Sequence, residues 1–209
     1  HNVKLVGHSE LNGWGDAFQI QVSKGIAYVA ASGINGHDGL TILDVSDPSK
    51  PKILNQISDS PGARTHKVLR ISDDIMITNS ELRPNLIGKY PDLKGGLKVF
   101  DISDPINPKF LKYVQTDGVG VHRPIYDRDR KLLYSSGYRD GFDKKILLIH
   151  DMKDPANPEF IGQGWVEGQK DGEKHSWDNS IVQNEAWCHE GNPCGNYVTA
   201  GWWDGGIVL

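Results

Sequence analysis

The sequence lacks the features that define several large classes of protein. Only two of its 209 residues are cysteine, and no apolar run approaches the roughly 18 residues that a membrane-spanning helix requires. Basic residues are scattered and the net charge is −4, which argues against a surface that binds nucleic acid. Helical periodicity, a P-loop and a GxSxG nucleophile elbow are absent. Glycine and proline, at 24 and 11 residues, are abundant and favour short strands joined by tight turns.

Two features bear on where the protein is located. The chain has no visible signal peptide but does not begin with methionine, so we expect a processed or trimmed N-terminus. Cys188 and Cys194 stand in WCHEGNPCG, where they can bridge across a tight loop. Two reduced thiols and a zinc pair are the alternatives, although CxxC spacing and a second cysteine pair are missing. A disulfide would indicate a periplasmic or secreted protein.

One eight-residue phrase occurs three times: DVSDPSKP from Asp44, DISDPINP from Asp101 and DMKDPANP from Asp151. Each copy lies between strand-like runs, and two further runs precede it in every unit. The twelve runs are 17–22, 26–32, 39–44 and 52–57, then 66–71, 75–80, 96–101 and 109–114, then 122–127, 131–138, 145–151 and 159–166. A fourth unit begins with 194–203 and 205–209 and stops where its own phrase would start.

Four strands per unit of about 50 residues are typical of a β-propeller blade. A β-sandwich is the alternative, but it gives no reason for the same turn in every unit. We therefore expect an all-β protein with about four antiparallel four-stranded blades, as part of a larger propeller of about six to eight blades. The expected blade units are about 14–60, 63–115, 119–166 and an incomplete 186–209, with 167–185 as an insertion loop.

The repeated phrase itself is predicted to be the turn between the third and the outer fourth strand. Its prolines fix φ, and its Asp and Ser side chains can accept hydrogen bonds from nearby backbone amides. A calcium loop is the alternative, but the dense alternation of oxygen ligands that such a loop needs is missing.

The pattern GLTILDVSDPSKP, GLKVFDISDPINP and ILLIHDMKDPANP resembles the LVIVD-repeat family of bacterial β-propellers, over essentially the whole chain. The segments GHSELNGWGD (7–16), THKVLRI (65–71), GVGVHRPIYD (118–127) and WCHEG (187–191) are similar to one subgroup of that family. The resemblance implies a propeller fold. It implies little about function, because a fold does not determine chemistry.

Three histidines and a carboxylate stand at equivalent places near the starts of the first strands. When the units are aligned on their second strands, these residues are His66, His122, His189 and Asp16. Neighbouring blades converge on the axis of a propeller, so the four side chains can face one point. Neutral imidazoles with a carboxylate suit Zn, Fe, Mn, Cu or Ni. The alternative is that each histidine bonds the backbone or an acid of a neighbouring blade.

Other residues are expected at the same end of the propeller as these three histidines. Glu81, Tyr138 and Asp204 follow second strands and are predicted acid–base or orienting groups. His175 in the insertion is a candidate base, or else a solvated loop residue. Arg123 would point away from His122 in a regular strand, and Glu190 is expected on a Gly-Asn-Pro turn. Predicted substrate contacts, with interblade packing as the alternative for the tryptophans, are Trp14, Trp187, Trp203, Asp204 and Arg123.

Two functions are consistent with this pattern. The first is an extracytoplasmic, metal-dependent hydrolase, lyase or oxidoreductase that acts on a small polar or glycan-like substrate. The second is a non-catalytic scaffold that binds a protein or glycan through rim loops such as 166–186. Neither requires nucleic acid or a membrane span.

Overall fold

The computed structural model describes residues 2–33, 37–58, 62–82, 89–90, 93, 95–174 and 186–209. Within these ranges the regular structure is antiparallel β, apart from one 3-10 turn at Leu11–Gly13. The all-β fold expected from the sequence is confirmed. Among the described residues, no helix has the length and apolar character needed to cross a membrane.

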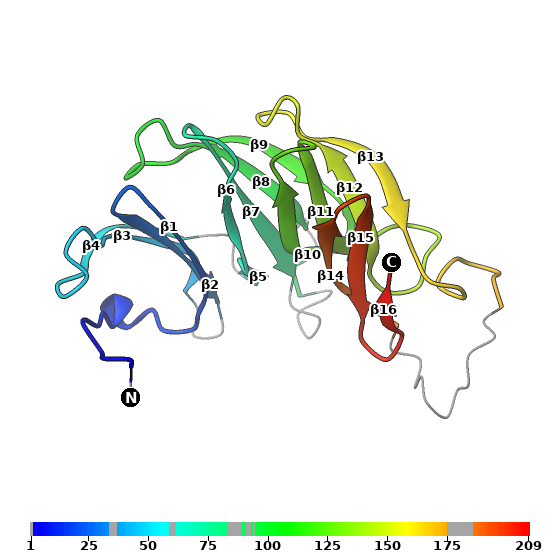
Figure 1. Ribbon diagram of the computed structural model, residues 1–209, viewed down its shortest axis with the longest axis horizontal. Helices are drawn as coiled ribbons and strands as arrows, with labels where there is room; N and C mark the ends of the chain where they lie inside the picture. The colour runs from blue at the N-terminus through cyan, green and yellow to red at the C-terminus, as the bar shows by residue number, and fades with distance from the viewer. Residues whose placement is uncertain are drawn as a thin grey trace.

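The strands form three sheets that stand side by side along an arc (Figure 1). The first sheet has the order β1-β2-β3-β4, the second has the order β13-β12-β11-β10-β7-β8-β9 with β5 and β6 also on β7, and the third has the order β14-β15-β16. The strands are β1 (Ala17–Ser23), β2 (Ile26–Ser32), β3 (Asp38–Asp44), β4 (Lys52–Ser58), β5 (Ala63–Arg64), β6 (Val68–Arg70), β7 (Ile75–Leu82), β8 (Gly96–Asp101), β9 (Lys109–Gln115), β10 (Asp117–Asp127), β11 (Leu132–Tyr138), β12 (Ile146–Asp151), β13 (Glu159–Gly164), β14 (Cys188–Cys194), β15 (Tyr197–Trp202) and β16 (Gly206–Val208).

The repeated phrase is the turn between a third and a fourth strand, as predicted, at β3–β4, β8–β9 and β12–β13. In each copy the first aspartate accepts a hydrogen bond at Oδ1 from the amide two residues on, at 2.9 Å for Asp44, 2.8 Å for Asp101 and 2.8 Å for Asp151. The second aspartate does the same, as in the 3.0 Å bond from Ser49 to Asp47. Both aspartates therefore stabilise their own turn.

The core lies between consecutive repeat units rather than within one closed layer. Tyr28 and Ile42 of β2 and β3 pack with Met76 and Phe100 of β7 and β8. Two further apolar clusters repeat this arrangement, one joining β7 and β8 to β10 and β11, and the other joining β11 and β12 to β14 and β15. Packing of each four-stranded unit on the next is the arrangement of propeller blades.

The second and third units are also joined through their backbones, because β10 crosses the end of β7 at Gly120, which pairs with Glu81. Gly120 has a φ of +99°, and a Cβ there would lie 2.4 Å from the carbonyl oxygen of Ser80 and 2.5 Å from Cα of Gly95. Only glycine allows this approach. The contact brings the start of β10 directly against the end of β7.

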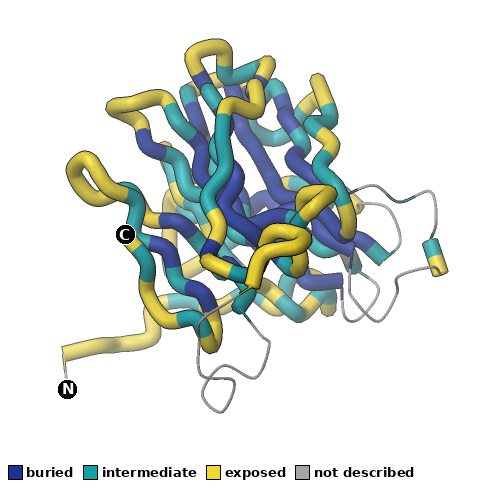
Figure 2. Tube along the Cα trace, turned by 90° about the vertical axis from the view of Figure 1, so that its right-hand side faces the viewer, coloured by how far each residue is buried: buried dark blue, intermediate teal, exposed yellow. Residues whose placement is uncertain are grey.

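The two ends of the strands form two distinct rims. Asp101, which begins the turn after β8, pairs with Ile75 at the start of β7, so Glu81 near the end of β7 lies at the opposite rim. The buried residues run along the strands between the rims, and the exposed residues concentrate in the turns and the N-terminal segment (Figure 2). Glu81 and the histidines described below therefore lie away from the repeated turns.

One local prediction was wrong. The segment CHEGNPC is the strand β14, in which Cys188 pairs with Trp202 and Cys194 with Tyr197. An extended strand of seven residues separates its ends by about 20 Å, so the two cysteines cannot bridge, and both are free. Glu190 is likewise part of β14 and not of a turn. The cysteines therefore give no support to a periplasmic or secreted location.

Candidate metal site at the inner strands

A buried carboxylate, that of Glu81, is the centre of the site. Its side chain is 0% exposed. Nε of Arg64 lies 2.9 Å from Oε2, and Nδ1 of His122 lies 2.8 Å from the same oxygen. Nζ of Lys145 forms an ion pair with the other oxygen, Oε1. The carboxylate thus joins residues of β5, β7, β10 and the segment before β12, which belong to two neighbouring units.

These partners determine the protonation of the pair formed by Glu81 and His122. Burial acts to raise the pKa of the Glu81 carboxyl, but the hydrogen bond with His122 and the charges of Lys145 and Arg64 outweigh it and lower that pKa. An ionised carboxylate only accepts, so Nδ1 of His122 must donate. Burial lowers the pKa of His122, so this imidazole is neutral near pH 7 and its Nε2 carries a lone pair.

His66 adds a second buried imidazole with an unused nitrogen. Its Nε2 is buried, has no hydrogen-bond partner among the described residues, and lies 3.9 Å from Oε2 of Glu81. Burial, followed by the charge of the neighbouring His122 and Arg64, lowers the pKa of His66 to about 3. Phe18 of β1 stacks on the ring at a centroid distance of 4.0 Å and holds it in place. One atom each of His66, Glu81 and His122 lie within 4.8 Å of one another.

The three histidines predicted as metal ligands form a continuous row of rings. The ring centroids of His66 and His122 are 4.3 Å apart, and those of His122 and His189 are 5.3 Å apart. Two imidazoles bound to one tetrahedral Zn²⁺ through nitrogens at about 2.1 Å would have centroids roughly 5 Å apart. Each neighbouring spacing is close to that of two imidazoles on one ion, whereas His189 lies outside the group formed by His66, Glu81 and His122. His189 is also in edge contact with Trp203, at 6.2 Å.

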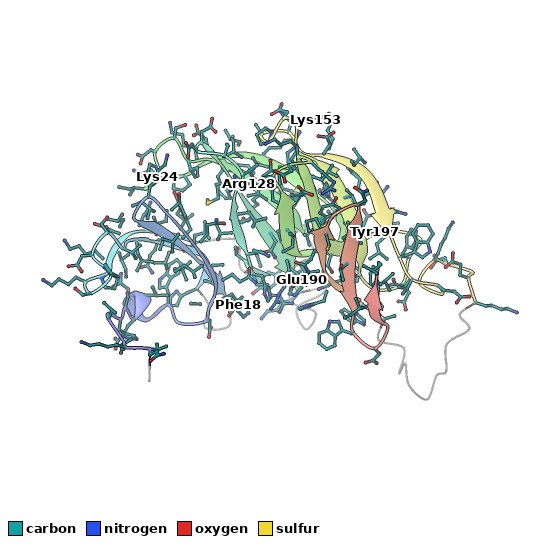
Figure 3. The ribbon with its side chains drawn as sticks, in the orientation of Figure 1. Phe18, Lys24, Arg128, Lys153, Glu190 and Tyr197 are labelled. Carbon is teal, nitrogen blue, oxygen red and sulfur yellow. The ribbon has the colours of Figure 1, made fainter. Side chains whose placement is uncertain are left out.

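Irregular backbone helps to bring these residues together. The register of β10 shifts between His122 and Ile125, and that of β14 shifts between Cys188 and Glu190. Bulges bend a strand and redirect its side chains, and they are common beside functional sites. One lies at His122 and the other at His189. Figure 3 shows Phe18 and Glu190 toward one rim of the molecule and Lys24 and Lys153 toward the other.

The remaining predicted residues have different positions. Asp16 lies just before β1 and outside the group of His66, Glu81 and His122, and its carbonyl accepts a hydrogen bond from Ser32. Asp204 is exposed in the turn after β15. Tyr138 flanks the carboxylate: burial, followed by the charge of Glu81, raises its pKa to about 12. His175 lies outside the described residues.

The tryptophans are divided between two regions. Trp187 is in edge contact with Tyr138 at 6.5 Å, and Nζ of Lys145 lies 5.8 Å from its ring centroid, so it borders the Glu81 cluster. Trp203 borders His189, as described above. Trp14 instead stacks on His37 at 5.1 Å, in a pair that no contact of the described residues links to the cluster.

The regular strand on which the expected orientation of Arg123 depended is not present. Its φ is +38° and the strand is bulged at this point, so the alternation of a regular strand does not apply. After burial, the charge of Arg123 is the largest cause of the lowered pKa of His189. It also contributes to the lowered pKa of His66.

Sequence reasoning missed Arg64 and Lys145, the two cations on Glu81. A signal existed for each. Arg64 precedes His66 by two residues, the spacing that places side chains on one face of an extended chain. Lys145 begins KILLIHD, where the equivalent runs DGLTILD and GGLKVFD have Asp38 and Gly95. A cation at this position, where the other two units have an aspartate and a glycine, is specific to the third unit.

The comparisons agree with the repeat pattern. The family described as LVIVD repeat matches residues 14–58 and 84–116, which lie in the first two units. The predicted resemblance is confirmed for these two segments, and the third phrase, from Asp151, lies outside the match. The antiparallel sheets arranged along an arc are the propeller architecture that these repeats imply. No curated protein matches the chain.

Proposed function

We propose that this LVIVD-repeat protein binds one divalent transition metal ion through Nε2 of His66 and Nε2 of His122, with His189 as a third imidazole. The observation that carries the proposal is the buried, unpartnered Nε2 of His66 beside a His122 whose Nε2 is left free by Glu81. Buried polar atoms without partners are rare in folded proteins, and a bound ion explains this one.

Glu81 acts in this proposal as an orienting group and not as a ligand. Its Oε2 already accepts from Arg64 and His122, and its Oε1 is paired with Lys145, so direct ligation would displace a cation. A carboxylate that accepts from the far nitrogen of a metal-bound histidine fixes the ring and raises its basicity. The pair of His122 and Glu81 has this arrangement.

The chemistry follows from the donor set. An ion with three imidazole ligands and an open position can lower the pKa of bound water or polarise a carbonyl oxygen. Zn, Fe, Mn, Cu and Ni all accept nitrogen ligands of this kind. Lys145 and Tyr138 flank the carboxylate, where they can orient a small polar substrate or hold a proton. We propose metal-dependent hydrolysis, elimination or oxidation of such a substrate.

A second function is favoured by the same ion pairs. The network comprises Glu81 and Arg64 of one unit and His122 and Lys145 of the next. In this second function, its role is to hold the two units together. The propeller would then be a scaffold that binds a protein or glycan partner through its rim. This alternative predicts no metal affinity and leaves Nε2 of His66 unexplained.

Equilibrium dialysis of the chelator-treated protein against Zn²⁺ and Co²⁺ separates the two functions. We expect one ion per chain in the wild type and loss of that ion in the His66→Ala/His122→Ala variant. His150→Ala is the matched control, because His150 is also buried with an unpartnered nitrogen, Nδ1, but packs against Phe160 at 5.8 Å. It should bind metal as the wild type does. A folded wild type that binds no ion would contradict the proposal and favour the scaffold.

A further inference from the structure

Each repeat unit has two faces, and alternate residues of its second strand point to them. In the first unit, Tyr28 of β2 lies in an apolar cluster with Met76 of the second unit, whereas the adjacent Ala27 points to the opposite face. In the second unit, Met76 packs on the first unit and Ile77 on the third. Ala27 and Met76 are equivalent, because each follows the residue that pairs with the first aspartate of the repeated phrase. The face of Ala27 therefore corresponds to the face with which a later unit packs on the preceding one.

This face of the first unit is apolar, and no other unit packs on it within the part of the chain that the structure describes. Its centre is a buried cluster of Ala27, Val29 and Leu43, and every member of that cluster belongs to the first unit or to the N-terminal segment. Ile20 pairs with Val29 and Val22 pairs with Ala27, so both side chains lie on the same face. There they are 59% and 56% exposed.

A pocket of about 380 Å³ opens in this face, between the sheet and residues 7–9 of the N-terminal segment. On the side of the sheet and the repeated turn, its lining includes Ala27, Leu43, Val45 and Pro48. Most of this lining is apolar, and a pocket of this kind suits an apolar or aromatic side chain.

The equivalent residues of the second unit receive a tyrosine from the first. The hydroxyl of Tyr28 donates to the carbonyl oxygen of Pro105 at 2.9 Å, and Tyr28 lies in one apolar cluster with Met76, Phe100 and Ile102. The sequence positions that correspond to these four residues of the second unit are those of Pro48, Ala27, Leu43 and Val45. The pocket is therefore the counterpart, in the first unit, of the place that Tyr28 occupies in the second.

The fourth unit has the complementary face. In β15, Val198 and Trp202 pack toward the third unit, so Tyr197 and Gly201, which alternate with them, point away from it. Ile207 of β16 pairs with Gly201 and lies on the same outward face. Tyr197 and Ile207 are 66% and 78% exposed. In each of the three preceding units, the corresponding face packs on the next unit.

We propose that a second copy of this chain packs head to tail on the first, with the outward face of its fourth unit on the pocketed face of the first unit. Such an interface continues a packing that already occurs three times within the chain. The first and fourth units stand at opposite ends of the arc (Figure 1), so the two faces lie apart in one chain. Contacts at both ends would join two arcs into a closed ring of eight units, within the range expected from the sequence. The proposal does not depend on the metal site.

Sedimentation velocity of the full chain over a range of concentrations tests this assembly. Ile20→Glu places a charge on the face of the first unit, and Ile207→Glu places one on the face of the fourth. Because both side chains are exposed, each variant should fold, which circular dichroism verifies. Ile161→Glu is the matched control, since Ile161 is 54% exposed on the outer strand β13 and on neither face.

We expect the wild type and Ile161→Glu to sediment as dimers and the other two variants to sediment as monomers. An equal mixture of Ile20→Glu and Ile207→Glu should form dimers again, because one of the two contacts in the mixed dimer joins unaltered faces. A monomeric wild type would overturn the inference and leave the pocketed face to a different partner. A dimeric Ile207→Glu variant would also overturn it, because two first-unit faces would then pack on each other. Failure of the mixture to associate would contradict the head-to-tail arrangement.

Discussion

Nδ1 of His122 lies 2.8 Å from Oε2 of the fully buried Glu81. The ionised carboxylate can only accept, so this contact fixes the imidazole as the tautomer that carries its proton on Nδ1. Its Nε2 then has a lone pair, and its ring neighbours those of His66 and His189. The candidate metal site follows from this one hydrogen bond.

Replacing the orienting carboxylate should weaken metal binding without abolishing it. Glu81→Gln keeps an acceptor for His122 but removes the charge that raises the basicity of the imidazole. We expect about 10- to 100-fold weaker Zn²⁺ binding, measured by competition with a chromophoric chelator. Tyr138→Phe, which keeps the ring beside Trp187 and removes only the hydroxyl, is the control and should retain wild-type affinity. Complete loss of metal in Glu81→Gln, with the fold intact, would indicate that Glu81 is a ligand.

The ion pair of Lys145 and Glu81 should contribute strongly to stability, because both side chains are almost entirely buried. Lys145→Met removes one counter-charge and leaves Arg64 to neutralise the carboxylate. We expect the free energy of unfolding in urea to fall by about 3 kcal/mol. Lys24→Met breaks an exposed pair with Asp73 and should leave that free energy almost unchanged. Equal stability of Lys145→Met and the wild type would contradict the buried network.

Acid should destabilise the metal-free protein through His66. In the unfolded chain this imidazole binds a proton below about pH 6.5, whereas burial keeps the folded one neutral until about pH 3. The unfolded state therefore binds more protons between these values, and the stability present above pH 6.5 is lost as the pH falls. Below pH 6, the free energy of unfolding in urea should fall with decreasing pH in both proteins. The fall should be about 1.4 kcal/mol per pH unit smaller in His66→Leu than in the wild type. If the free energies of unfolding of the two proteins fall equally with pH, the lowered pKa of His66 is refuted.

The two cysteines should behave as independent thiols. Cys194 is exposed, whereas Cys188 is buried and burial raises its pKa to about 12. A thiol reagent should therefore modify one cysteine in the native protein and both in 8 M urea, without prior reduction. Failure of either thiol to react in the denaturant would show a disulfide and contradict the strand assigned to β14.

The strands and their turns were predictable because their signals are local. The phrase that starts at Asp44 recurs with the same Asp and Pro positions, and each copy builds its turn from its own side chains. Counting from these turns also placed Glu81, Tyr138 and Asp204 at equivalent positions after the second strands. In a chain built from repeats, equivalent positions can be identified by counting even where the residues at them differ.

The charged partners of Glu81 were not predictable, because they depend on contacts between units. Arg64 and Lys145 are 81 residues apart and meet only where Gly120 lets β10 cross β7. The bulge at His122 and Ile125 has no sequence signal of its own, and CHEGNPC becomes a strand because it pairs with β15. Glycine, asparagine and proline in that segment indicated a turn, and tertiary pairing overrode them.

X-ray absorption spectroscopy of the Zn²⁺-loaded protein tests the central claim most directly, because it counts the atoms bound to the ion. We predict nitrogen neighbours at about 2.0–2.1 Å with the multiple scattering of at least two imidazoles, and loss of that scattering in the His66→Ala/His122→Ala variant. The Glu81→Gln variant should keep the same spectrum at saturating metal. A spectrum without imidazole scattering, or one that is unchanged in the double histidine variant, would contradict the account.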